Sequence, residues 1–160
     1  MPDSQAAHEK TITSLLPAIA GANSIYGSGM LDLGQTFSME QLVIDNDIIA
    51  MNFRAMEGIP VTDDTLAVAA TKEVGVGNDF LGHITTMENF EMASNPAVFD
   101  RTMLGEWRAN GSKNAVERAH DVVVDVMANY EVLPIEAETL AAMEAIVKKA
   151  DEAFVKRMQE

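Results

Sequence analysis

The chain has 160 residues and a mass of 17.3 kDa, a length typical of one domain with a buried core. Its 11 basic and 25 acidic residues give a formal net charge of -14, which disfavours nucleic acid and anionic membranes as partners. There is no cysteine, so disulfides, thiolate nucleophiles and cysteine-bound metals are excluded. The sequence shows neither a membrane-spanning apolar run nor a signal-peptide pattern, and we therefore expect a cytoplasmic protein.

The first part of the chain combines a helix, a short strand and a loop. Apolar residues at i, i+3, i+4 and i+7 predict a helix over residues 4–20. The run 22–27, bounded by glycines, is the best strand candidate, and a glycine-rich loop follows over 27–35. Because a lone strand cannot satisfy its own backbone hydrogen bonds, we expect its partner strands to lie outside this chain.

A second helix has explicit start and stop signals. Ser38 and Gln41 are spaced as a reciprocal capping box, and Gly58 provides a left-handed end. The apolar residues predicted to form its packed face are Leu42, Ile49, Phe53 and Met56.

Helices also dominate the rest of the chain. Thr62, Thr85 and Ser112 are the expected N-caps of three of them. The five predicted helices cover 62–74, 85–93, 103–109, 112–130 and the residues after Pro134. The fold class predicted for the isolated chain is mainly α with one or two short strands.

The residue pattern alone does not define a reaction. Gly27–Gly29 lacks the third glycine of a dinucleotide-binding loop and the lysine of a P-loop, and a sharp turn at a strand end accounts for it. The three histidines have no ligand partners at metal spacing, so no metal site is expected. His83 lies in a loop and is either a site residue or a structural histidine. No acid–base pair of carboxylates and no Ser/His/Asp set can be assembled.

Several runs, taken in order, resemble the C-terminal part of the trimethylamine:corrinoid methyltransferase family. That family includes pyrrolysine-containing trimethylamine methyltransferases and pyrrolysine-free relatives such as glycine betaine methyltransferases. The runs that carry the resemblance are Pro2–Ala7, Gly21–Gly29, Thr36–Asp45, Gly77–His83 and Phe99–Arg101.

The resemblance implies a TIM-type α/β barrel that transfers a methyl group from trimethylamine, or a related methylated amine, to the Co(I) of a corrinoid. The corrinoid is carried by a separate partner protein, so we expect no cofactor bound directly to this chain. Residues 1–111 would be the C-terminal part of the barrel, and 112–160 a helical tail packed on it. We expect the full-length protein to be a homo-oligomer and this chain alone to be inactive.

Barrel active sites lie at the C-terminal ends of the strands, which gives the segment 23–26 and the loop after it a role. The resemblance yields no assigned catalytic residue. An aromatic face suits a methylated cation, although a packed barrel tyrosine is an equal alternative for Tyr26. The candidates that would face substrate or corrinoid are Tyr26, Gly27, Gly29, Gln35, Phe37 as an apolar wall, and His83.

In pyrrolysine-containing members, the special residue lies just before the stretch that matches 1–7. We therefore expect Met1 to be an internal methionine and the reading frame to extend upstream through an amber codon. A truncated gene or an isolated C-terminal region is the alternative. The rival class is a non-catalytic helical interaction or regulatory protein. A closed bundle would favour that rival, whereas large exposed apolar patches favour part of a barrel.

Overall fold

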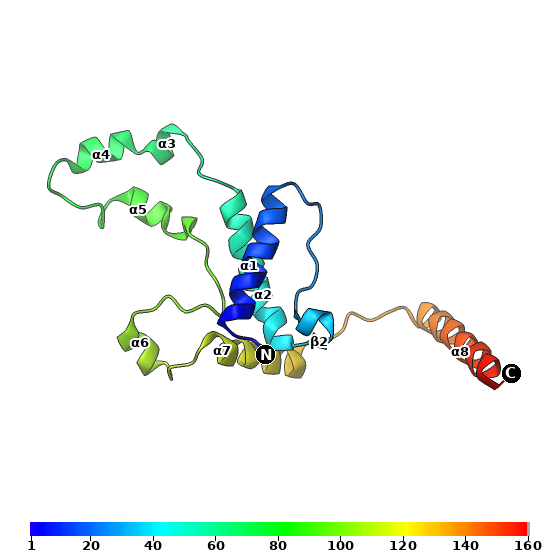
Figure 1. Ribbon diagram of the computed structural model, residues 1–160. Helices are drawn as coiled ribbons and strands as arrows, with labels where there is room; N and C mark the ends of the chain where they lie inside the picture. The colour runs from blue at the N-terminus through cyan, green and yellow to red at the C-terminus, as the bar shows by residue number, and fades with distance from the viewer. Residues whose placement is uncertain (160) are drawn as a thin grey trace. The chain divides into compact units, whose positions relative to one another are not determined.

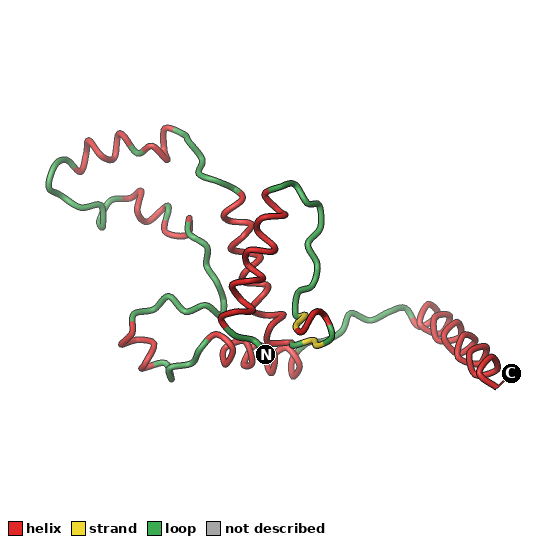
Figure 2. The backbone as a smooth tube through the Cα atoms, in the orientation of Figure 1, coloured by secondary structure: helices red, strands yellow, loops and turns green. Residues whose placement is uncertain are grey.

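The computed structural model describes residues 1–159 and divides the chain into two compact units, Met1–Ala128 and the residues from Asn129 onward. Both are mainly helical (Figures 1 and 2). In chain order the elements before the boundary are α1 (Ser4–Ile19), β1 (Met30–Leu31), η1 (Asp32–Gly34), β2 (Thr36–Phe37), α2 (Met39–Met56), α3 (Asp63–Leu66), α4 (Val68–Val74), α5 (Ile84–Glu88), η2 (Phe90–Met92), α6 (Leu104–Ala109) and α7 (Ala115–Asn129).

The long helices α1 and α2 lie side by side and form the centre of the first unit (Figure 1). Asp3 caps α1 by accepting a hydrogen bond of 2.9 Å from the backbone N–H of Ala6. The helix then runs through Pro17 to Ile19, which confirms the first predicted helix.

The strand predicted over 22–27 is wrong in this structure, because that segment is irregular. The sheet in the described residues is instead a hairpin from the glycine-rich loop, where Met30 pairs with Phe37 and Leu31 with Thr36. A strand needs a second strand to pair its backbone N–H and C=O groups, and no strand pairs with 22–27 within residues 1–159.

The start and the end of α2 follow the sequence signals. The side chain of Ser38 accepts from the backbone N–H of Gln41 at 3.2 Å, and Gly58 follows the helix with φ of 70°. The reciprocal half of the predicted capping box is absent, because the Gln41 side chain donates to Asp45 instead, at 2.7 Å. The N-cap is therefore confirmed and the full capping box is wrong.

The buried face of α2 differs from the predicted one. Phe53 is 63% exposed, Leu42 and Met56 are also exposed, and Ile49 is half-buried. Polar and apolar residues share the face that is buried instead, which consists of Gln41, Ile44, Asp45, Asp47, Ile48 and Asn52.

A small core joins α2 to α7. Ile44 and Ile48 pack with Val98 and Ala119, the most completely buried apolar residues of this cluster. The buried carboxylate of Asp47 accepts backbone N–H groups from residues 97–99, at 3.0, 2.7 and 3.4 Å. This connection fixes the 97–99 segment against α2 and gives α7 its place in the unit.

The α3–α5 region follows the predicted helices with three changes. The helix predicted over 85–93 is shorter, because α5 ends at Glu88 and the 3-10 helix η2 covers Phe90–Met92 separately. Thr62 caps α3 in a reciprocal box with Thr65, as its position predicts. Ala67 has φ of 51°, so the predicted 62–74 helix is divided into α3 and α4. His83 caps α5, since its ring accepts from the backbone N–H of Thr85; the prediction that Thr85 is the cap is wrong.

The N-cap of helix α7 lies two residues after the expected one. Asn114 accepts from the backbone N–H of Glu117 at 3.0 Å, while the Glu117 carboxylate accepts from the Asn114 N–H at 2.8 Å. Ser112 has φ of 56°, whereas an N-cap residue adopts an extended backbone. The cap predicted at Ser112 is therefore wrong.

The second unit contains α8 (Ala137–Gln159), which confirms a helix after Pro134. Its apolar side chains are exposed, including Leu140, Val147 and Phe154. Across the described part of the chain, no helix has both the length and the apolar content needed to cross a membrane. The domain boundary predicted at 111/112 concerns packing on a barrel and stays a prediction.

Candidate functional site

The turn Gly27–Gly29 is held to α1 and α2 by an ion pair between half-buried Lys10 and buried Asp45. Lys10 donates to Asp45 Oδ2 at 2.8 Å and also to the carbonyl of Gly27 at 2.9 Å. The same Asp45 oxygen accepts from the Gly29 backbone N–H at 2.7 Å. Asp45 is 3% exposed, so these bonds form in a site with little water. The predicted candidates Gly27 and Gly29 are thus brought together by Lys10 and Asp45.

Gly29 is also constrained by its neighbours. Its φ of 77° lies in the left-handed region, and a Cβ atom at this position would lie 2.6 Å from Cε2 of Phe37. The ring of Phe37 therefore lies directly against the Gly29 backbone. Phe37 forms an apolar wall of this turn, next to Leu42 of α2.

Tyr26 precedes the turn and is 90% exposed. It borders a small cleft of about 70 Å³ whose lining includes Lys10, Ser14 and Asp45. Gln35 lies in the connection between β1 and β2, where its backbone N–H donates to the Asp32 carbonyl at 3.0 Å and its side chain is exposed. Tyr26 therefore lies at the anchored turn, while Gln35 is positioned by the hairpin.

His83 belongs to a different part of the unit. Its Nδ1 hydrogen-bonds the Thr85 hydroxyl at 2.8 Å, its Nε2 lies 3.5 Å from Glu73, and its ring meets Phe80 edge-on. All of these partners lie within residues 73–85, so His83 is tied to its own segment. Figure 2 shows this segment apart from the hairpin.

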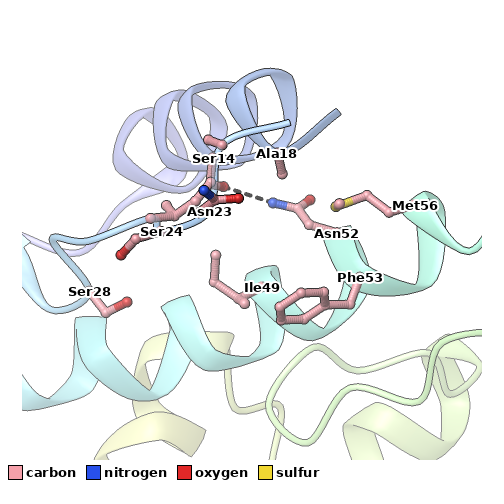
Figure 3. A pocket seen from close by; sticks show the side chains of 11 residues that line it. Ser14, Ala18, Asn23, Ser24, Ser28, Ile49, Asn52, Phe53 and Met56 are labelled. Atoms are coloured by element: carbon pink, nitrogen blue, oxygen red, sulfur yellow. Dashed lines mark hydrogen bonds between the residues drawn. The ribbon is translucent and has the colours of Figure 1, made fainter. Parts of the chain in front are cut away.

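A larger cleft of about 220 Å³ lies between α1, residues 22–28 and α2. Figure 3 shows Asn52 of α2 bonded across it to Ser14 of α1, with Nδ2 to Oγ at 2.7 Å. Its lining combines short polar side chains with Ile25, Ile49, Phe53 and Met56, and it contains no titratable residue. The cleft can therefore bind or pack neutral groups, but it offers no acid or base.

Several residues of this site were not anticipated from the sequence. They are Lys10 and Ser14 on α1, and Asp45 and Asn52 on α2, which connect the two helices in two polar bridges. The signal was present in α2, where Gln41, Asp45 and Asn52 recur at helical spacing on one face. The side-chain Oε1 of Gln41 is buried and accepts no hydrogen bond from the described residues.

Two carboxylates with perturbed acidity lie outside the turn. The pKa of Glu40 is lowered, first by its hydrogen bond with His120 at 3.0 Å and then by bonds from its own backbone and Ser38. The pKa of Asp100 is lowered by hydrogen bonds from the side chain and backbone of Thr102. Both shifts stabilise the charged form, which is typical of structural carboxylates rather than of general acids.

The described residues contain no cluster of side chains suited to bind a metal ion. Within residues 1–159, no group of three or more histidine, aspartate or glutamate side chains is arranged to hold a metal ion. The chemical groups that the turn offers are an aromatic ring, a fixed backbone turn and a buried ion pair.

Comparison with known proteins defines the class. The family model described as trimethylamine methyltransferase (MTTB) matches residues 1–154, so the chain falls among the methyltransferases. It is 56% identical over 154 residues to trimethylamine methyltransferase MttB of Methanosarcina barkeri, and 38% identical to MttB of Desulfitobacterium hafniense strain DCB-2. A glycine betaine methyltransferase of D. hafniense strain Y51 is 26% identical over 147 residues, which are 91% of this chain and 30% of that protein.

The chain belongs to the trimethylamine methyltransferase family, which confirms the resemblance drawn from the sequence. The alignments with both MttB proteins include 96% of this chain but only 31% of each relative. The chain thus spans about a third of the length of these relatives.

Proposed function

We propose that this chain forms part of an enzyme that transfers a methyl group from trimethylamine, or a related methylated amine, to a corrinoid held by a separate protein. The observation that carries the proposal is the 56% identity to an MttB over 154 residues. The more distant similarity to a glycine betaine methyltransferase leaves the choice of methylated amine to experiment.

The exposed surface supports the proposal that more polypeptide completes the enzyme. The first unit, Met1–Ala128, leaves many large apolar side chains at its surface. Large apolar side chains on α2 are among the exposed ones, including Leu42, Phe53 and Met56. Such a surface is typical of an element whose packing partner belongs to another segment or chain.

The segment 22–27 fits the position of a barrel strand in this proposal. It follows α1 and precedes the β1–β2 hairpin and α2, so a strand formed here in the complete enzyme would stand between two helices along the chain, as in an α/β barrel. Neighbouring strands would supply hydrogen-bond partners for its backbone. The turn Gly27–Gly29 would then stand at the C-terminal end of the strand, where barrel enzymes place their sites.

Positioning is the main contribution that these residues offer. The amine released when a methylated amine loses a methyl group is a poor leaving group, so the methyl carbon must be held in line with its acceptor. A corrinoid held by the partner protein would supply a Co(I) nucleophile for the methyl carbon, and the electrons of the carbon–nitrogen bond would stay on the departing amine. The Tyr26 ring provides an aromatic face for the methylated ammonium form of the substrate, and Phe37 provides an apolar wall.

Methyl transfer can be measured with trimethylamine, a corrinoid protein and a reductant, following dimethylamine formation and loss of the Co(I) absorbance. We expect no turnover with the 160-residue chain alone. We expect turnover when the chain is joined to the additional sequence that a full-length family member contains. A folded, full-length protein that transfers no methyl group from any methylated amine would contradict the proposal and favour a non-catalytic interaction protein.

The role of Tyr26 has its own matched control. Replacing Tyr26 by Ala removes the aromatic face and should lower kcat/KM for the amine roughly 3-fold to 30-fold, whereas Tyr26→Phe keeps the face and most of the activity. Tyr130→Ala removes the other tyrosine, which is also exposed, and should leave kcat/KM unchanged. Equal losses in Tyr26→Ala and Tyr130→Ala would assign the effect to general destabilisation.

A further inference from the structure

We propose that Lys10 and Asp45 are positioning residues, which fix the Gly27–Gly29 turn and thereby set the direction in which Tyr26 faces the methylated amine. This inference rests on the proposed function for its consequence in catalysis. Its structural part, the fixing of the turn, stands on the geometry of the ion pair.

The ion pair holds the turn at both ends. The ammonium of Lys10 binds the carbonyl of Gly27 at 2.9 Å, and the carboxylate of Asp45 binds the N–H of Gly29 at 2.7 Å. Lys10 and Asp45 bind each other at 2.8 Å. The cation thus holds a backbone acceptor, and the anion holds a backbone donor two residues later.

The turn needs such an anchor because its sequence is flexible. Gly27 and Gly29 have φ of 100° and 77°, and glycine has the widest range of backbone conformations in the unfolded chain. One backbone bond, from the Met30 N–H to the Gly27 carbonyl at 3.0 Å, closes the turn itself. That bond sets the shape of the turn. Its place against α1 and α2 is set by the bonds to Lys10 and Asp45, together with the bond from the Ser38 N–H at the N-cap of α2 to the Gly29 carbonyl at 2.9 Å.

Tyr26 depends on this anchor more than a buried residue would. Its side chain is 90% exposed, so little packing holds the ring, and its nearest fixed point along the chain is the Gly27 carbonyl held by Lys10. The helix pair, by contrast, has a second polar bridge between Ser14 and Asn52 at 2.7 Å. Loss of the Lys10–Asp45 pair should therefore disturb the turn more than it disturbs the packing of α1 on α2.

The stability expected from the Lys10–Asp45 pair, whose carboxylate is buried, agrees with a positioning role. Such pairs often add little stability relative to apolar residues of similar size, whereas leaving one partner alone is strongly destabilising. Asp45 is surrounded by donors, since its Oδ1 also accepts from Gln41 Nε2 at 2.7 Å. The pair and its amide neighbour therefore orient a carboxylate toward one backbone N–H, that of Gly29.

Hydrogen exchange of the Gly29 amide tests the structural part in the 160-residue chain. Asp45→Asn should accelerate this exchange roughly tenfold to a hundredfold, because a bond to a charged acceptor is lost. Lys10→Arg should keep the protection, and Lys10→Met should lose it. Asp121→Asn is the matched control, since Asp121 forms an exposed ion pair with Lys113, and it should leave Gly29 unchanged.

A double variant separates loss of the turn's anchor from loss of folding. Lys10→Met combined with Asp45→Asn removes both charges, so no lone charge is left buried. We expect this double variant to keep the helical circular dichroism signal and to lose the protection of Gly29. Unchanged Gly29 exchange in the folded double variant would overturn the inference.

Kinetics of the full-length enzyme test the consequence. Asp45→Asn should lower kcat/KM for the amine at least as much as Tyr26→Ala, roughly 3-fold to 30-fold, and Lys10→Arg should restore activity relative to Lys10→Met. Full activity in a variant whose Gly29 is unprotected would overturn the positioning role. A wild-type enzyme that transfers no methyl group would instead overturn the proposed function. The hydrogen exchange of Gly29 would still test whether Lys10 and Asp45 fix the turn.

Discussion

Gly29 gives the sharpest test of how the turn is packed, because a second glycine of similar conformation serves as its control. Gly29 and Gly58 have φ of 77° and 70°, so alanine at either position meets the same left-handed backbone penalty. A Cβ atom at Gly29 would lie 2.6 Å from Phe37 Cε2 and 3.2 Å from Leu42 Cβ. At Gly58 nothing lies within 4 Å.

The expected losses of stability follow from these distances. Gly58→Ala should lower the free energy of unfolding by about 1–2 kcal/mol, the penalty of a left-handed alanine. Gly29→Ala should lower it by about 2–5 kcal/mol, because overpacking adds about 1–3 kcal/mol. The ring of Phe37 is 58% exposed and can swing away, whereas Leu42 Cβ is fixed to its helix. We therefore expect the two variants to differ in free energy of unfolding by about 1 kcal/mol, near the lower end of the overpacking range.

Urea unfolding followed by circular dichroism at 222 nm measures both variants. In a Phe37→Ala background, Gly29→Ala should lose part of its excess effect over Gly58→Ala, because the contact with Phe37 is gone while the contact with Leu42 Cβ remains. Equal losses for Gly29→Ala and Gly58→Ala in the wild-type background would refute the packing of Phe37 and Leu42 against this turn.

Two further predictions concern carboxylates of α2. Asp47→Asn should lower the free energy of unfolding by about 2–3 kcal/mol, since residues 97–99 lose a charged acceptor, whereas exposed Glu91→Gln should stay within about 0.5 kcal/mol in urea unfolding. The pKa of Glu40 lies below its ordinary value of 4.5 because of His120, so its contribution to stability is present above pH 4.5 and is lost as the pH falls through the lower folded value. Thermal unfolding of Glu40→Gln and wild type should therefore differ at pH 6 and converge once the pH falls below the lowered pKa of Glu40 in the folded chain. A constant difference would contradict the assignment.

Local signals were sufficient to predict where the main helices begin and end. The cap at Ser38 and the left-handed Gly58 depend on a few neighbouring residues, and both are confirmed. The caps of α5 and α7 were each misplaced by two residues, because several residues that can cap stand close together there. Which of them caps depends on backbone angles such as the φ of 56° at Ser112.

The packing partner of a helix face could not be predicted from α2 alone. Its apolar stripe with Phe53 is exposed in this structure, and its polar stripe with Asp45 is buried against α1. The choice depends on Lys10, which lies 35 residues away and neutralises the buried carboxylate. Of the site candidates, Gly27, Gly29, Tyr26 and Phe37 meet at one turn, whereas the location of His83 depends on a separate segment.

The most direct measurement of the central claim is a methyl-transfer assay with and without the rest of a family-length polypeptide. With trimethylamine, a reduced corrinoid protein and the complete protein, we expect dimethylamine to form, and we expect none from the 160-residue chain alone. Sustained turnover by the chain alone, or none by a folded complete protein with any methylated amine, would contradict the proposal that this chain is one part of a methyltransferase site.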